Sequence, residues 1–347
     1  MTPRERVMTA VGHGVPDRTP ADYKAEPEVN EAMLNSLQLG SYDELLNKLE
    51  VDIRRIEPCY VGPPSKVLAD GVTEDYWGIR AKQMKASHGT YSMYVETDVW
   101  HAETVEDLDK HSWPSPDIFD YSVMPEQCGQ YPEHAIMFEG SDLFTRPCIL
   151  RGMENMMLDM VMRPEIAHYI MEKFTAFYCE DLTRAAESTG GGFQLYCEWS
   201  DFGTQEGLLI SVPMWREFIG PYLKRLIDVC HSCGTKFMLH SCGAIRELIP
   251  DLIEMGVDIL DPIQVMAKGM EPAGLKKDFG DRLCFHGGLC TQSTLPFGTP
   301  DDVKREVLDR VATLGEGGGY VIAPSHNIQP DTSVENILAM YDTTLRA

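Results

Sequence analysis

From residue 135 to the end of the chain, short apolar runs alternate with amphipathic helical segments. Runs of this length are typical of buried strands, whereas apolar residues at helical spacing predict helices. We expect strands at residues 135–138, 193–197, 236–239, 257–260, 283–286 and 320–323. We expect helices at residues 164–188, 213–232, 244–255 and 300–314. This alternation indicates an α/β fold in which crossover helices join parallel strands.

Two earlier strand candidates, residues 19–24 and 51–56, bring the strand count to about eight. Eight strand–helix units favour a closed (β/α)₈ TIM barrel over an open sheet. A doubly wound sheet is the alternative, but no G-x-G-x-x-G follows a first strand. We therefore expect one barrel domain over residues 1–347. Residues 1–50 would be mainly an N-terminal helical extension, and residues 66–96 a small excursion of short strands. Residues 113–132 are Pro-rich, which predicts a long loop.

The charge balance excludes several kinds of partner. The chain has 347 residues, 30 Lys plus Arg and a formal net charge of −24. Binding to nucleic acid or to an anionic membrane surface requires clustered cations, so neither is expected. The first residues are charged, and no apolar run approaches the length of a spanning helix. These features predict a cytoplasmic protein whose ten cysteines are free thiols or metal ligands.

Polar residues follow most of the predicted late strands. A TIM barrel builds its active site at the carboxyl ends of its strands, so these residues are the candidates for chemistry. They are Glu198, Asp201, Gln205, His240, Cys242, Asp261, Gln264, Cys290, Ser325 and His326. Arg146 follows the strand at residues 135–138 and is a candidate for binding an anionic substrate group, with a structural ion pair as the alternative.

The sharpest local feature is H-S-C-G at residues 240–243. Residues two apart at a strand end point to the same side, and imidazole and thiolate are both zinc ligands. The sequence therefore predicts a zinc site at His240 and Cys242, with Cys290 or His326 as the third ligand. A second pair, Cys230 and Cys233, falls at the end of a helix on the opposite face, where a structural role is expected.

Several motifs in one order resemble the uroporphyrinogen decarboxylase superfamily, over essentially the whole chain. They are T-P-R-E-R-V (residues 2–7) with P-D-R (16–18), D-Y-W-G (75–78), D-F-G-T-Q (201–205) with L-I-S-V-P (209–213), H-S-C-G (240–243), G-G-L-C (287–290) with L-P-F-G-T-P (295–300), and P-D-T-S-V-E-N (330–336). The resemblance implies a (β/α)₈ barrel, in agreement with the strand count.

The superfamily contains metal-independent decarboxylases and cobalamin-dependent methyltransferases. The decarboxylases grip tetrapyrrole carboxylates with an Arg-rich segment near the N-terminus, which residues 19–26 (T-P-A-D-Y-K-A-E) do not match. The coenzyme M methyltransferases bind zinc with a His-x-Cys pair and a distant Cys. His240 and Cys242 match the pair, whereas His326 stands where those enzymes have Cys, and Cys290 where many relatives have Asp. This departure favours the methyltransferases that act on methoxylated or methylated compounds, such as the components of O-demethylases.

The resemblance thus implies a zinc-dependent methyltransferase acting between a small O-, S- or N-methyl compound and the cobalamin of a separate corrinoid protein. Glu198 and Asp201 are candidates for acid, base or substrate anchor, and Gln205, Gln264 and Arg146 for substrate binding. The chain itself has no D-x-H-x-x-G cobalamin motif. A homodimer is compatible with the resemblance. The alternatives are a metal-independent lyase similar to uroporphyrinogen decarboxylase and a non-catalytic metal-binding barrel.

Overall fold

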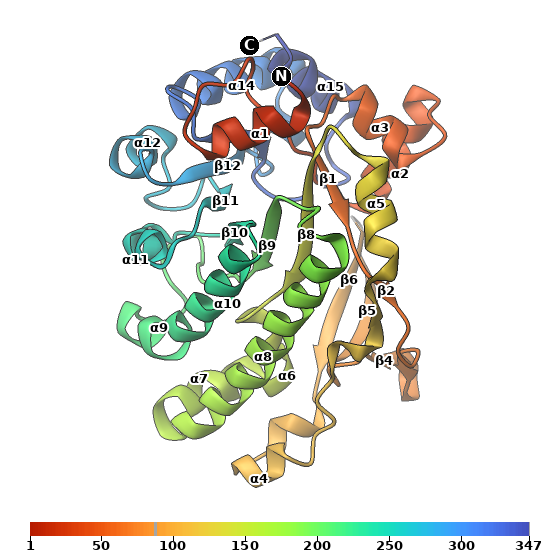
Figure 1. The fold of residues 1–347 in the computed structure, drawn as a ribbon, viewed down its shortest axis with the longest axis vertical. Helices are drawn as coiled ribbons and strands as arrows, with labels where there is room; N and C mark the ends of the chain where they lie inside the picture. Colours follow the sequence, from red (N-terminus) through yellow and green to blue (C-terminus); the bar gives the residue numbers. More distant parts are fainter. Residues whose placement is uncertain (87–88, 347) are drawn as a thin grey trace.

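Seven parallel strands form the main sheet of the computed structural model, which describes residues 1–86 and 89–346 (Figure 1). In sheet order they are β1 (Ile53–Ile56), β8 (Ala135–Ser141), β9 (Leu195–Trp199), β10 (Lys236–His240), β11 (Ile259–Ile263), β12 (Cys284–Leu289) and β13 (Tyr320–Pro324). Every neighbouring pair is parallel. The expected late strands are confirmed to within a few residues.

Residues 20–22 close the sheet into a barrel. Ala21 makes a parallel bridge to Ile322 of β13, and the amide N of Asp22 donates to the carbonyl of Ile322 over 2.9 Å. On the other side, the amide N of Asp52, just before β1, donates to the carbonyl of Ala21 over 2.9 Å. This short segment takes the position of an eighth strand between β13 and β1, so the predicted TIM-barrel fold is confirmed.

The crossover helices pack along the outside of the sheet (Figure 1). The principal ones are α8 (Pro164–Thr189), α9 (Val212–Phe218), α10 (Gly220–Ser232), α11 (Ile249–Met255), α12 (Pro272–Phe279), α14 (Pro300–Leu314) and α15 (Val334–Thr344). All but α15 have proline in the first turn, and a left-handed glycine follows the last turn of α8 (Gly190) and α11 (Gly256). The shorter α6 (Thr145–Arg151), α7 (Met153–Met162) and α13 (Thr294–Phe297) complete the shell.

Three helices precede β1: α1 (Pro3–Val11), α2 (Pro27–Leu37) and α3 (Tyr42–Lys48). Val7 and Val11 of α1 belong to the same buried cluster as Ile53 of β1, Met238 of β10 and Val321 of β13. Those strand residues line the barrel interior, so α1 plugs the amino end of the barrel. The opposite, carboxyl end is left open for a site.

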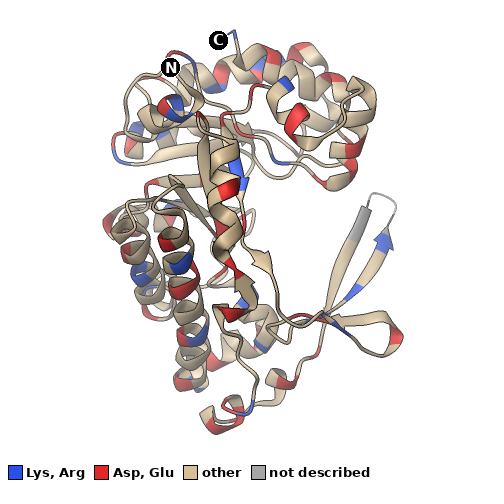
Figure 2. Cartoon of the chain, turned by 45° about the vertical axis from the view of Figure 1, so that its right-hand side comes forward, with Lys and Arg blue, Asp and Glu red and all other residues tan. Residues whose placement is uncertain are grey.

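The expected strand excursion is an antiparallel sheet of β3 (Lys66–Val67), β4 (Val72–Glu74), β5 (Arg80–Ala86) and β6 (Gly89–Val95). Its β5–β6 hairpin projects beside the barrel (Figures 1 and 2). Two further strands, β2 (Cys59–Tyr60) and β7 (Phe119–Asp120), pair antiparallel, and a short helix α4 (Val105–Leu108) follows β6.

The loop predicted over residues 113–132 is wrong in part, because α5 (Met124–Gln130) forms there. Pro125 lies in its first turn, where proline is compatible with a helix and lacks only an N–H that would be unpaired anyway.

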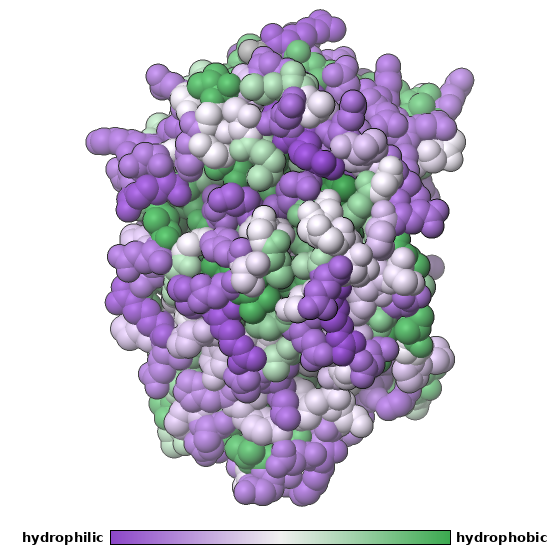
Figure 3. Space-filling model, in the orientation of Figure 1, coloured by the Kyte–Doolittle hydropathy of each residue, from purple (hydrophilic) through white to green (hydrophobic). Residues whose placement is uncertain are grey.

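Within the described residues, no helix is both long and apolar enough to cross a bilayer. The face drawn in Figure 3 is mainly hydrophilic, and the acidic residues, red in Figure 2, are spread over the helices.

Candidate metal centre

Three potential metal ligands meet at the carboxyl ends of β9 and β10. His240 is the last residue of β10, Cys242 lies two residues beyond it, and Asp201 lies two residues beyond the end of β9. The two strands are neighbours in the sheet, so their ends lie side by side. One ligand atom from each residue lies within 4.8 Å of the others. The His240 Nε2 atom is 3.5 Å from Cys242 Sγ and 3.8 Å from Asp201 Oδ1.

Backbone contacts hold the H-S-C-G loop in this position. The amide N of Cys242 donates to Asp201 Oδ1 over 2.8 Å, and the amide N of Gly243 donates to Gln264 Oε1 over 2.6 Å. Gly243 has φ +91°, and a Cβ there would lie 2.6 Å from the backbone of Gly203. Only glycine fits this conformation and this close approach, which explains the residue after the cysteine.

Asp261 of β11 orients the His240 ring. Its Oδ2 lies 2.6 Å from His240 Nδ1, and the ring of Trp199 lies against the imidazole with centroids 4.2 Å apart. A carboxylate oxygen can only accept a hydrogen bond, so this contact assigns the N–H of the ring to Nδ1. It leaves the Nε2 lone pair directed at Cys242. A carboxylate behind a histidine is the usual way in which proteins fix a metal-binding imidazole.

Asp261 is also the end of a buried chain of charges. It accepts hydrogen bonds from Lys24 Nζ (2.7 Å) and His286 Nδ1 (2.6 Å). His286 Nε2 lies 3.2 Å from Asp22 Oδ2, and Asp22 receives a two-pronged contact from Arg55 at 2.9 and 2.6 Å. The sequence analysis missed Lys24, Asp22 and Arg55, although charged residues in predicted strands were a usable signal.

The pKa values within this chain follow from burial and pairing. Burial alone would lower the pKa of His286, but the carboxylates of Asp261 and Asp22 raise it above its usual value. Burial would raise the pKa of Asp261, but the cations around it hold it well below its usual range. With His286 protonated, the cations Lys24, Arg55 and His286 balance the carboxylates of Asp22, Asp261 and Glu139. Arg55 contacts Glu139 at 2.7 Å.

A cavity of about 200 Å³ lies over the cluster and is lined by two of its members, Asp201 and His240, but not by Cys242. Its lining includes Lys24, Trp199, Asp201, His240 and His326. It shares Asp142, Thr145 and Trp199 with a cavity of about 530 Å³ that lies against the excursion sheet. It shares His326 with a third cavity, of about 520 Å³. The shared residues join the three cavities at the open end of the barrel.

The two predicted catalytic carboxylates lie in different places. Asp201 belongs to the ligand cluster, whereas Glu198 is fully buried on the outer side of β9, the side of Tyr196, and accepts hydrogen bonds from the Leu143 amide N (2.8 Å) and the Ser200 hydroxyl. Burial, and then the charge of Asp142, raise the pKa of Glu198 to about 8. Asp142, which the sequence analysis missed, lines two of the cavities, and burial raises its pKa to about 7.

The predicted substrate-binding residues also separate. Arg146 lines the 530 Å³ cavity, where its Nη2 donates to Asp75 Oδ2 over 2.6 Å. Gln264 lines the 520 Å³ cavity and supports Gly243. The side chain of Gln205 is exposed, and its carbonyl accepts the Lys268 amide N over 3.0 Å.

Of the two candidates for a third ligand, His326 lines the cavity over the cluster and Cys290 does not. Cys290 is buried, and its Sγ accepts a hydrogen bond from Ser293 over 3.0 Å. In the described ranges, neither residue contributes an atom to the cluster that Asp201, His240 and Cys242 form.

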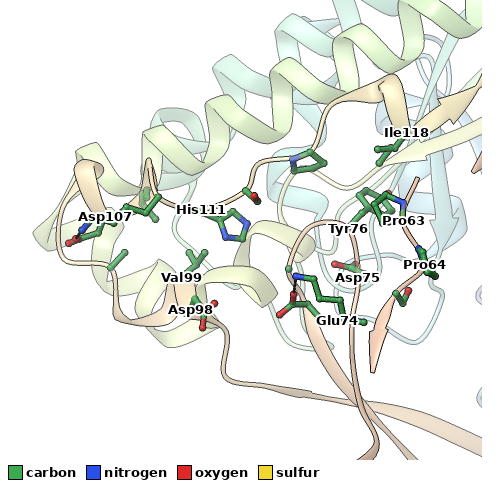
Figure 4. Close-up of a pocket in the computed structure, with 18 of the residues that line it drawn as sticks. Pro63, Pro64, Glu74, Asp75, Tyr76, Asp98, Val99, Asp107, His111 and Ile118 are labelled. Carbon is green, nitrogen blue, oxygen red and sulfur yellow. Dashed lines mark hydrogen bonds and ion pairs between the residues drawn. The ribbon is translucent and has the colours of Figure 1, made fainter. Parts of the chain in front are cut away.

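A further cavity, about 730 Å³, lies away from the cluster, between the excursion sheet and α4 (Figure 4). Tyr76, Pro63, Val99 and Ile118 supply apolar lining. Its acids are already paired, as Glu74 is with Lys66 at 2.7 Å. Asp75 is shared with the 530 Å³ cavity, so the pair that Asp75 forms with Arg146 separates the two.

Comparisons with known proteins agree on a family and a fold. The model of the uroporphyrinogen decarboxylase (URO-D) family matches residues 142–346. The chain is 21% identical over 187 residues to the uroporphyrinogen decarboxylase of Chlorobaculum parvum, and this match covers 53% of this chain and 50% of that protein. It is 33% identical over 132 residues to the methylcobamide:CoM methyltransferase MtaA of Methanosarcina barkeri, and this match covers 38% of this chain and 36% of that protein. The chain thus spans half or less of the length of these relatives.

Among solved structures, a methyltransferase from Methanosarcina mazei superimposes with a TM-score of 0.69. The two are 17% identical, and the match covers 100% of this chain and 99% of the other. At this identity the likeness establishes the shared barrel fold. The resemblance found in the sequence motifs is confirmed, including the similarity to methyltransferases within the superfamily.

Proposed function

Because the chain belongs to the uroporphyrinogen decarboxylase family, we propose that it is a zinc-dependent methyltransferase. It would move a methyl group between a small methylated compound and the cobalamin of a separate corrinoid protein. The observation that carries this proposal is the cluster of Asp201, His240 and Cys242, with His240 oriented by Asp261. A decarboxylase that works without metal has no need of such a donor set.

The donor set fits zinc. Nitrogen, sulfur and oxygen ligands at normal zinc bond lengths in a tetrahedron are roughly 3.5 Å apart. The Nε2–Sγ and Nε2–Oδ1 distances of 3.5 and 3.8 Å agree with this spacing. Burial raises the pKa of the Cys242 thiol, so a cation at this place would supply the charge that favours the thiolate.

His240 and Cys242 would hold the ion, with Asp201 of the cluster and His326 of the cavity lining as the candidates for further ligands. Cys290, engaged with Ser293, stays a weaker candidate. Zinc bound there would act as a Lewis acid on the leaving oxygen or sulfur of a methyl donor, or lower the pKa of a thiol acceptor.

The chain's own residues would bind and orient the small molecule. Its methyl end would lie in the 200 Å³ cavity against Trp199, and its body in the 530 Å³ cavity beside Arg146. Asp142 lies where the cavities join, and its raised pKa suits proton transfer near neutral pH. Glu198 would act indirectly, because its carboxyl oxygen accepts the amide N of Leu143 and so fixes the loop that begins there.

The corrinoid would come to the open end of the barrel on a partner protein. The cavity over the cluster is too small for a cobalamin, but it adjoins two larger ones at the barrel mouth. A homodimer remains compatible with this arrangement, provided that the mouth stays open.

The second candidate is a metal-independent lyase of the decarboxylase kind, which the match to curated uroporphyrinogen decarboxylases favours. The cation of Arg55 would suit a carboxylate group, but its nitrogens already contact Glu139 and Asp22 of the chain itself.

The test is methyl transfer followed through the absorption spectrum of free cobalamin, which changes when its cobalt is methylated. Methylated oxygen, sulfur and nitrogen compounds are offered in turn to wild type, Cys242→Ala and the control Cys233→Ala. We expect activity in wild type and in the control, and its loss in Cys242→Ala. Equal activity in all three proteins would overturn the proposal.

A further inference from the structure

We infer that Lys24 and Trp199 form an oxyanion-binding subsite beside the metal centre, so that the methyl donor is a methyl ether with a flat, apolar body. This inference rests on the proposed function and names its substrate class. It concerns a residue outside every motif that pointed to the family.

Lys24 lies two residues beyond the segment (residues 20–22) that closes the barrel, and its side chain is 7% exposed. In the described part of the chain its ammonium has one hydrogen-bond partner, Asp261 Oδ2 at 2.7 Å. An ammonium carries three donors, so two remain. Lys24 lines the same cavity as His240 and Asp201, which makes this cavity the place for an acceptor.

The ammonium keeps its charge in this position. Burial alone would lower the pKa of Lys24, but the carboxylate of Asp261 raises it above its usual value. The Nζ atom also lies 4.4 Å from the centroid of the Trp199 ring, an arrangement that stabilises a cation electrostatically.

Satisfying Asp261 does not require Lys24. Asp261 Oδ1 accepts from His286, and Oδ2 accepts from His240. Both carboxylate oxygens therefore have a donor without the lysine. Lys24 also balances the buried carboxylates, but that role uses one of its three donors.

The charge selects among the three classes of methyl donor. When a methyl ether reacts, the bond from the methyl carbon to oxygen breaks and its electron pair stays on oxygen. The methyl carbon bonds to the nucleophile that the partner carries, and the released oxyanion later takes a proton from water. Lys24 can donate to that oxygen as its charge develops. A quaternary ammonium donor would instead be repelled, and sulfur is a weaker hydrogen-bond acceptor.

The lining indicates the shape of the rest of the molecule. Trp199 belongs to both the 200 Å³ and the 530 Å³ cavities, and Ile149 and Tyr178 continue the apolar wall of the larger one. A flat ring that carries the ether oxygen would stack on these groups, with its oxygen beside Lys24.

The test measures binding of 4-nitrophenol, whose anion absorbs visible light, to zinc-loaded wild type, Lys24→Met, Lys24→Gln and the exposed-surface control Lys48→Met. Lys24→Gln keeps a donor for Asp261 while removing the charge. We expect wild type and the control to prefer the phenolate over the neutral phenol. Phenolate affinity should fall about tenfold to a hundredfold in both Lys24 variants, at unchanged zinc content, as for other hydrogen bonds to charged groups.

Unchanged phenolate affinity in the Lys24 variants would overturn the inference, as would an equal loss of phenol and phenolate. If neither variant folds, the wild-type titration still decides, because a protein without preference for the phenolate has no such subsite. Methyl transfer from ethers in the absence of any Lys24 effect would contradict this inference alone. A Lys24-dependent phenolate preference without methyl transfer to cobalamin would contradict the proposed function alone.

Discussion

The carboxylate of Asp261 holds the imidazole of His240 by a 2.6 Å contact at Nδ1, and its other oxygen contacts His286 at the same distance. One side chain thus joins the potential metal ligand to the buried charges in the barrel wall. The arrangement makes the direction of His240 depend on a residue that does not belong to the ligand cluster.

Asp261→Asn should weaken zinc binding about tenfold to a hundredfold, as loss of a carboxylate behind a metal-binding histidine typically does. Competition with a chromophoric chelator measures the affinity. The matched control is Asp258→Asn, which removes the carboxylate that contacts His231 at 2.8 Å, on the outside of the barrel. Equal zinc affinity in wild type and Asp261→Asn would refute the positioning role.

Gly243→Ala should lower the free energy of unfolding by more than the backbone strain of a positive φ alone would. A Cβ at Gly243 would lie 2.6 Å from the backbone of Gly203, whereas at Gly234, which has φ +76°, it meets nothing within 4 Å. We expect a loss of about 1 kcal/mol for Gly234→Ala and about 3 kcal/mol for Gly243→Ala, with weaker zinc binding only in the latter. Urea unfolding measures both, and equal losses would contradict the close-approach argument.

Glu198 should make the free energy of unfolding fall as pH rises. Its pKa is raised to about 8 in the fold, from an ordinary 4.5, so the folded chain binds more protons than the unfolded chain between these values. The stability that the neutral form contributes is complete below about pH 4.5 and is lost towards pH 8, at up to about 1.4 kcal/mol per pH unit. Glu198→Gln should flatten this slope in urea unfolding. The exposed-site control Glu206→Gln should keep it, and an unchanged slope in Glu198→Gln would exclude the buried acid as its source.

His326 and Cys290 should differ in their effect on zinc. His326 lines the cavity over the cluster, and Cys290 does not. His326→Ala is expected to weaken zinc binding, and Cys290→Ala to leave it within about twofold of wild type, since the latter residue touches no proposed ligand. The reverse pattern in chelator competition would assign the third position to Cys290.

The barrel was predictable because each late strand is an apolar run that stands between helices with their own start and stop residues. Strand alternation predicted that His240 and Cys242 point to one side, but β10 ends at His240, and contacts of the following loop with Asp201 and Gln264 place Cys242 Sγ 3.5 Å from His240 Nε2. Asp201 was identified as a candidate for chemistry, but its position beside the ligands was not, because it depends on the register of β9 against β10.

The chain of charges behind the site could not be derived from spacing. Asp22 and His286 are 264 residues apart in sequence and meet only because residues 20–22 close the barrel against β13. Similarly, the helix at residues 124–130 was predicted as a loop because the stretch around it is rich in proline, although Pro125 is compatible with the first turn of the helix. Contacts that depend on closure are visible only in the folded chain.

The most direct test of the central claim is the zinc content of the purified protein by elemental analysis, wild type beside Cys242→Ala and Cys233→Ala. We predict about one zinc per chain in wild type and in Cys233→Ala, and its loss in Cys242→Ala, as expected for a ligand that supplies one of four bonds. Wild type that takes up no zinc even after incubation with the metal would contradict the metal centre and move the metal-independent lyase to first place.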